Sequence, residues 1–174
     1  MKFDLNNSIE ILERTPIILE SYLSGLSNNW VKNNEGKNTW SPYDIIGHLI
    51  FGEKTDWIIR AKTILSQSEN KIFEPFDRFA QLKENKNSSI SELITEFKDL
   101  RKSNLKELKS LNVTNKDYEL KGIHPELGEV SLEQLISTWV VHDLGHISQI
   151  SRVMANQYKS NVGPWKTYLG ILNK

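Results

Sequence analysis

Four stretches of the chain repeat apolar residues at the three- and four-residue spacing of an amphipathic helix, and polar connections separate them. The pattern predicts helices over residues 6–27, 41–66, 88–111 and 131–156. Four helices of roughly twenty residues each predict an all-α protein, a four-helix bundle with long connections. The last helix has a broad apolar face, formed by Leu132, Leu135, Ile136, Trp139, Val140, Leu144, Ile147, Ile150 and Val153.

Capping signals mark the start of two of these helices. Ser41 is an N-cap candidate, and Asp44 follows it at the spacing of a capping box. Ser88 or Ser89 can cap the third helix, and Glu92 follows Ser89 by three residues. The second and third helices are therefore expected to begin at these serines.

Proline interrupts the pattern at two places. Pro16 lies inside the first helix, where proline removes a backbone hydrogen bond, so we expect a kink or a restart near Thr15. Residues 67–87 are polar and contain Pro75, which predicts a long irregular connection with a short helix around 76–83. Connections this long often act as functional lids or covers.

The remaining connections are shorter. Residues 28–40 form a polar loop bounded by Trp30 and Trp40, which are expected to cover an edge of the core; stacking on a ligand is the alternative. Residues 112–130 form another connection. The tail over 157–174 is expected to pack back on the bundle as a short element.

The composition limits the classes of protein that the chain can belong to. A length of 174 residues predicts a single domain over 1–174. The absence of cysteine excludes disulfides, cysteine zinc ligands and a cysteine nucleophile, so a transition-metal site must use His, Asp or Glu. The formal net charge of zero, with lysines mixed among acids, gives no basic stripe for nucleic acid.

Targeting signals are also missing from the pattern. The first ten residues, MKFDLNNSIE, contain no apolar run long enough for a signal peptide. No apolar stretch approaches the ~20 residues of a membrane span. We therefore expect a cytoplasmic protein without a membrane partner.

The candidate chemistry lies in the histidines. His142 and His146 are four residues apart, so on a helix their Cβ atoms lie roughly 5–6 Å apart on one face, as two ligands of one metal ion would. His48 lies on or beside the apolar face of the second helix and is the expected third ligand. His124, before a proline in a connection, is the rival candidate.

Each histidine also has a plainer interpretation. A single histidine on an apolar face is more often a core residue bonded to a carbonyl group than a metal ligand. Three histidines on two helices that face each other favour a metal site, because helical bundles build such sites in their cores. Three imidazoles with one open position are the pattern of catalytic zinc.

Three neighbouring residues have weaker claims to a role. Asp143 points about 100° away from His142 on the helix, so it can accept a hydrogen bond from a ligand ring or be a surface charge. Glu53 can support the site or act as a base. Trp139 can line the mouth of a pocket, although core packing is the favoured interpretation.

The motifs together resemble a known family. The segments TWVVHDLGHISQISRVMA and WSPYDIIGHLI, with the tail YKSNVGPWKTYLGIL, are similar to the DinB-like superfamily, also called the bacillithiol-transferase-like or damage-inducible metal-binding fold. The resemblance covers nearly the whole chain. It implies a four-helix bundle in which three histidines hold a divalent metal ion, zinc or nickel. Carried over position by position, these are His48, His142 and His146; a homodimer is implied as well.

The resemblance suggests a reaction but does not fix one. The family includes thiol-dependent S-transferases, a mycothiol-dependent isomerase and many members without a known activity. Our hypothesis is a metal-dependent transferase that joins a small-molecule thiol to an electrophile, since a coordinated thiol is deprotonated and thiolate is the nucleophile. The alternatives are a hydrolase that uses metal-activated water, or a non-catalytic protein that binds metal for stability or serves as a dimeric interaction module.

Overall fold

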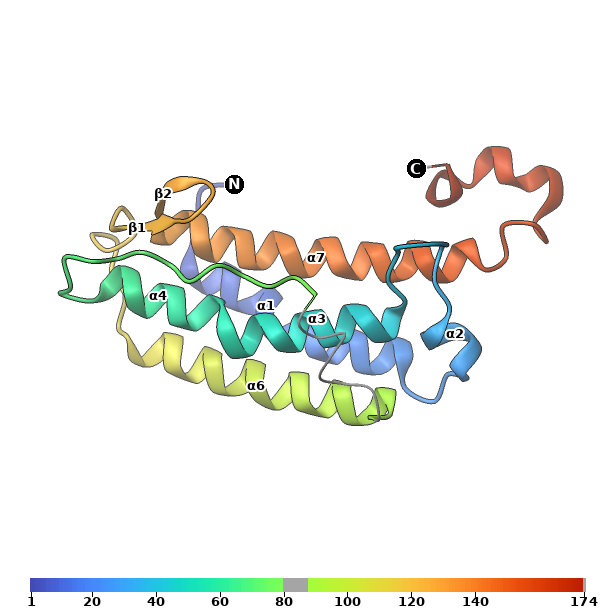
Figure 1. Cartoon of the computed structure of the whole chain (residues 1–174), viewed down its shortest axis with the longest axis horizontal. Coiled ribbons are helices and arrows are strands. Elements are labelled where there is room, and N and C mark those ends of the chain that lie inside the picture. The colour runs from blue at the N-terminus through green and yellow to red at the C-terminus, as the bar shows by residue number, and fades with distance from the viewer. Residues whose placement is uncertain (80–87, 174) are drawn as a thin grey trace.

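Four long helical segments lie side by side in the computed structural model, which describes residues 1–79 and 88–173 (Figure 1). Helix α3 is continued by α4, and together they make one of the four segments. This arrangement confirms the predicted fold class, an all-α four-helix bundle. The segments are α1 (Leu5–Leu23), α3 (Pro42–Thr55) with α4 (Trp57–Leu65), α6 (Ile90–Ser110) and α7 (Leu132–Asn156).

The order of the segments explains the longest connection. Helices α1 and α7 run in one direction, whereas α3, α4 and α6 run in the other (Figure 1). Helix α1 packs against α6 and α7, α3 packs against α6, and α4 packs against α7. Because α4 and α6 point the same way, the chain between them must return along the bundle, so a short turn cannot join them.

The predicted caps are present. Ser41 and Asp44 form a capping box at α3, in which the Ser41 N–H donates to Oδ2 of Asp44 at 2.9 Å. Ser89 and Glu92 form the same arrangement at α6. These reciprocal bonds satisfy backbone N–H groups that a helix start leaves without partners.

Several local expectations need correction. A short helix, α2 (Asn28–Lys32), lies inside the predicted loop over 28–40. The predicted helix over 41–66 is divided at Asp56, whose backbone has φ −119° and ψ −81°. The Trp57 indole after this break packs over Gly52, where an added Cβ would lie 3.1 Å from Nε1.

A β-hairpin interrupts the connection over 112–130, where no strand was predicted. Strands β1 (Lys121–His124) and β2 (Gly128–Ser131) pair antiparallel. The segment after α4 joins their edge: the Phe73 N–H donates to the Ile123 carbonyl oxygen at 2.9 Å, and the Ile123 N–H donates to that of Lys71 at 2.8 Å. Gly122 permits this contact, because a Cβ there would lie 2.4 Å from the Phe73 ring.

Two further expectations concern irregular segments. Residues 76–79 are not helical, so this half of the predicted short helix is wrong, and the other half lies outside the described residues. The tail forms the 3₁₀ helices η1 (Gly163–Tyr168) and η2 (Gly170–Leu172). Helix η2 packs against α7 and buries Leu172, as expected for a tail that folds back.

A buried arginine connects all four segments. Arg101 on α6 is 1% exposed, and its five N–H groups each have an acceptor. Nε and Nη2 donate to Oε1 of Glu53 on α3 at 3.1 and 2.8 Å, and Nη1 and Nη2 donate to the two carboxylate oxygens of Asp143 on α7 at 2.6 and 3.1 Å. Nη1 also donates to the carbonyl oxygen of Leu12 on α1 at 2.8 Å.

The acceptor on α1 is available because of Pro16. In a regular helix the N–H of residue 16 would donate to the carbonyl of residue 12, and proline has no N–H. Arg101 takes the place of that missing donor. Helix α1 continues through Pro16 as one element, so the predicted restart is wrong.

The same network satisfies Glu53 completely. Trp139 Nε1 donates to Oε1 at 3.1 Å, and Nδ2 of Asn104 donates to Oε2 at 2.9 Å and to the Glu53 backbone carbonyl at 2.8 Å. Burial raises the pKa of Glu53, and the positive charge of Arg101 opposes that rise. We call Arg101, Glu53, Asp143, Asn104 and Trp139 the arginine network.

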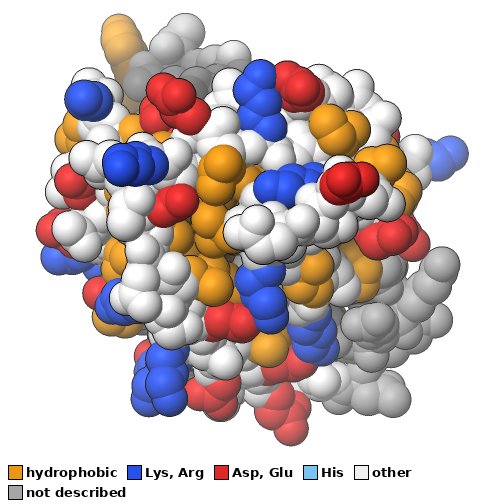
Figure 2. All heavy atoms as spheres, turned by 90° about the vertical axis from the view of Figure 1, so that its left-hand side faces the viewer, with side chains coloured by type: hydrophobic (Ala, Val, Ile, Leu, Met, Phe, Trp, Pro, Cys, Tyr) orange, Lys and Arg blue, Asp and Glu red, His pale blue; other side chains and the backbone are white. Residues whose placement is uncertain are grey.

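The surface is mixed in charge at the end of the bundle that carries the hairpin. Figure 2 shows acidic and basic side chains interspersed with hydrophobic ones there, without a continuous stripe of one sign among the coloured residues. This matches the balance of 22 basic and 22 acidic residues in the chain. Across residues 1–79 and 88–173, none of the helices combines the length and the apolar character that crossing a bilayer would need.

We expect Arg101→Met to lower the free energy of unfolding by about 3–5 kcal/mol, because it leaves two buried carboxylates without their cation. Urea denaturation measures the loss. Lys102→Met is the matched control, since Lys102 is exposed on the same helix. Equal losses in the two variants would contradict a dominant role for the arginine network.

Candidate metal centre

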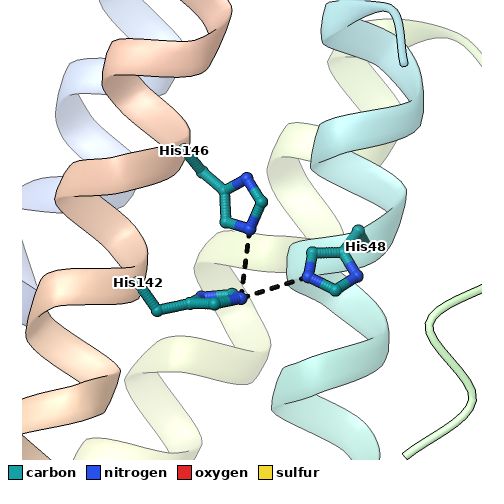
Figure 3. A group of neighbouring side chains, drawn as sticks. All are labelled: His48, His142 and His146. Carbon is teal, nitrogen blue, oxygen red and sulfur yellow. Dashed lines mark hydrogen bonds between the residues drawn. The ribbon is translucent and has the colours of Figure 1, made fainter. Parts of the chain in front are cut away.

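Three histidine side chains from two facing helices meet inside the bundle. His48 comes from α3, and His142 and His146 come from successive turns of α7 (Figure 3). The Nε2 atom of His142 lies 3.1 Å from Nε2 of His48 and 3.1 Å from Nε2 of His146. Two nitrogens of a tetrahedral zinc ion, each about 2.0–2.1 Å from the metal, would lie roughly 3.3 Å apart. The spacing is therefore that of a set of metal ligands.

Burial favours the neutral form of all three rings. Burial, with the charges of His146 and Arg78, lowers the pKa of His48 to about 3. Burial and the neighbouring imidazoles lower the pKa of His142 to about 2, and burial also lowers that of His146. Neutral imidazole offers a nitrogen lone pair, which is the form that binds metal.

Hydrogen bonds alone do not fully explain the cluster. A neutral ring has one N–H and one acceptor nitrogen. The Nδ1 atoms of His48 and His142 are buried without a partner among the described residues, while their Nε2 atoms point at each other. A shared cation would accept all three Nε2 lone pairs at once, so the residues present fit a metal ion.

Gln149 fixes the orientation of one ring. Its Oε1 accepts a hydrogen bond from Nδ1 of His146 at 2.8 Å. Because Nδ1 then carries the proton, Nε2 keeps its lone pair and points into the cluster. Sequence analysis missed Gln149, although its position three residues after His146, on the same helix face, was the available signal.

The cluster borders a cavity of about 390 Å³, a size suited to a small molecule. Trp40 forms part of its wall, with its ring 4.8 Å from that of His48. Trp40 and Trp30 also pack against the apolar core, as expected. Stacking of Trp40 on a ligand stays a prediction. The other described lining residues are Gly52, Asp56, Trp57, Arg60, Phe76, Arg78, His124 and Thr138, with the three histidines.

The weaker candidates have other roles. His124 reaches the cavity wall but lies outside the cluster; its Nδ1 accepts the backbone N–H groups of Glu126 and Leu127. Asp143 is fully buried and bonds to Arg101, so both its predicted role beside a ligand ring and its surface alternative are wrong.

Glu53 and Trp139 belong to the arginine network. Glu53 is buried, is absent from the described lining of the cavity and is bonded on both oxygens, which does not suit a base in the cavity. Trp139 packs in the core, as favoured, and stacks on Trp57 with ring centres 5.8 Å apart. Sequence analysis also missed Asp56, Arg60 and Arg78 on the cavity wall.

Fold and site together define a class: a helical bundle with three histidines on facing helices beside a small cavity. The chain belongs to the DinB superfamily, whose sequence profile matches residues 11–150. This range includes all three histidines.

Two solved structures share the fold. YfiT from Bacillus subtilis, which has an unusual four-helix bundle topology, superposes with a TM-score of 0.74 at 17% identity, over 93% of this chain and 91% of YfiT. TT2238, a four-helix bundle protein, gives a TM-score of 0.56 at 16% identity, over 84% of this chain and 97% of that one. No curated protein matches the chain in sequence.

We expect protein purified without a histidine tag to contain about one equivalent of divalent metal per chain, because three neutral imidazoles converge on one point. His142→Ala should lose most of this metal, measured by elemental analysis after gel filtration. His124→Ala should retain it, because His124 lies outside the cluster. Equal metal contents in all three proteins would exclude the cluster as the site.

Proposed function

We propose that the protein is a metal-dependent transferase that joins a low-molecular-weight thiol to an electrophilic small molecule, with His48, His142 and His146 holding a divalent ion, zinc or nickel. The observation that carries the proposal is the convergence of three neutral imidazoles at the wall of a small cavity. When bound, such an ion would acidify a coordinated thiol. In the reaction the S–H proton passes to solvent, and the sulfur forms a C–S bond with the electrophilic carbon. The bond from that carbon to the leaving group breaks, and its electron pair stays on the leaving group.

The residues of the chain supply the rest of the site. Trp40, Trp57 and Phe76 give apolar walls that exclude water from the thiol and suit the carbon skeleton of an electrophile. His48 is held by these walls, since its ring lies 5.5 Å from that of Phe76 and 4.8 Å from that of Trp40. The ligand set is therefore oriented before any substrate enters.

Cobalt substitution tests the thiol step. We expect 2-mercaptoethanol to change the visible and near-ultraviolet spectrum of the cobalt-loaded protein, because thiolate is a strong ligand for transition metals. The control is ethylene glycol, which has the same number of heavy atoms as 2-mercaptoethanol and carries a hydroxyl group in place of the thiol. A spectrum indifferent to thiols would end the transferase proposal.

Hydrolysis is the second candidate, and Asp56 favours it. This carboxyl group lines the same cavity; burial raises its pKa to about 6, against the opposing charge of its ion-pair partner Arg60. A carboxylate with a pKa near neutrality suits a general base that takes a proton from attacking water. YfiT, which shares the fold, is described as "a probable metal-dependent hydrolase".

If Asp56 is that base, kcat/KM for an ester such as 4-nitrophenyl acetate should rise with pH and level off above about 6, since the base works only as carboxylate. Asp56→Asn should abolish the step in the pH profile. A step that persists in the variant would assign the titration to another group, such as metal-bound water.

A metal with a purely structural role is the non-catalytic alternative. It requires that removing the metal lowers the melting temperature.

We also propose a cytoplasmic homodimer, on the family resemblance and on exposed aromatic residues of the tail. Trp165 and Tyr168 are 69% and 83% exposed, as large apolar groups at a partner surface would be in an isolated chain. Molar mass in solution tests the dimer.

A further inference from the structure

The described wall of the cavity carries more positive than negative charge. Arg60 and Arg78 line it, whereas Asp56 is the one carboxylate among the described lining residues. An anionic group would therefore be attracted to this wall before any metal charge is counted.

The two arginines are placed differently. Arg60 is buried, pairs with Asp56, donates from Nη2 to the Glu74 carbonyl at 3.3 Å and lies 5.1 Å from the centre of the Phe73 ring. Arg60 thus already has partners within the protein for its charge and for an N–H group. Arg78 is exposed, and within residues 1–79 and 88–173 it has neither an ion pair nor a hydrogen bond.

Arg78 nevertheless lies close to the histidines. It lines the same cavity as His48, His142 and His146. Two residues earlier, the Phe76 ring packs edge-on against the His48 ring at 5.5 Å and against the Phe51 ring at 5.2 Å. The guanidinium therefore sits over the cavity with its N–H groups available to a ligand.

The path of the segment after α4 determines the position of Arg78. Figure 1 shows the extended segment after α4 lying along the bundle beside α4 and α3. The backbone bonds of Phe73 and Ile123 fix one end of that segment to the hairpin, and the Phe73 ring fills the space over Gly122. The long return connection thus carries Phe76 and Arg78 to the site.

We propose that the small molecule bound in this cavity carries a carboxylate, which Arg78 recognises while the reacting group lies at the three histidines. Arginine suits the task, because its planar N–H groups bind a carboxylate through two parallel hydrogen bonds. For the transferase, the thiol substrate would then be a mercaptocarboxylate, a thiol that also carries a carboxylate group. This assignment of the thiol substrate rests on the proposed function. Arg78 is then a specificity-determining residue.

The first test compares two thiols on the cobalt-loaded protein. We expect 3-mercaptopropionate to bind more tightly than 2-mercaptoethanol, and Arg78→Gln to reduce the ratio of the two dissociation constants by about tenfold, a usual size for a charge-assisted contact. Intrinsic differences between the thiols cancel in this comparison of variants. Arg14→Gln, an equal change of charge at an exposed site on α1, should leave the ratio unchanged.

The second test does not need a thiol to bind. Calorimetry compares 3-phenylpropionate with the uncharged 3-phenylpropan-1-ol on metal-loaded wild type, Arg78→Gln and Arg14→Gln. A carboxylate preference that Arg78→Gln alone removes supports the inference, even if thiols leave the cobalt spectrum unchanged and the transferase proposal fails. An unchanged preference in Arg78→Gln, in either test, would overturn it, because the carboxylate would then be bound by the metal or by another group.

Discussion

A buried guanidinium is the constraint on which this bundle depends. Taking a charge out of water costs several kcal/mol unless it is paired and every donor is satisfied. Arg101 meets that requirement only when α1, α3 and α7 all present their acceptors at the same level of the bundle. A shift of any of these helices by one turn would break hydrogen bonds of the network and leave buried polar or charged groups without a partner. The network therefore specifies the register of the helices as well as their contact.

The register matters because the network lies next to the histidine cluster. Asp143 follows His142 directly, and Glu53 is five residues after His48. Above and below this level the core is apolar and divides into two clusters. The middle of the bundle is thus a polar layer. Leucine side chains there would pack more favourably, but the ion pairs give the side chains a defined arrangement. The apolar halves on either side keep water from it.

The sequence predicts the parts of this arrangement that are local. The four helices, the caps at Ser41 and Ser89 and the pair His142–His146 depend on spacing within one helix, and His48 follows from its place on an apolar face. The arginine network depends on partners 42 to 89 residues apart. Arg101 and Asn104 continue the core-facing spacing of Phe97 and Leu108 on α6, yet charged and polar residues on a helix usually face water, so the pattern does not mark them as core residues. The hairpin strands, four residues each, are too short for a clear alternation.

Helix α7 contributes side chains to both the arginine network and the histidine cluster. Successive side chains on a helix diverge by about 100°, so adjacent residues cannot point to the same place. His142 faces the cavity, and Asp143 faces Arg101. The rotation of α7 about its axis is therefore fixed by a buried ion pair, and the same rotation directs His142 and His146 at His48. A rotation of α7 that moved His142 and His146 away from His48 would therefore also separate Asp143 from Arg101, so the arginine network stabilises the orientation of α7 that the cluster requires.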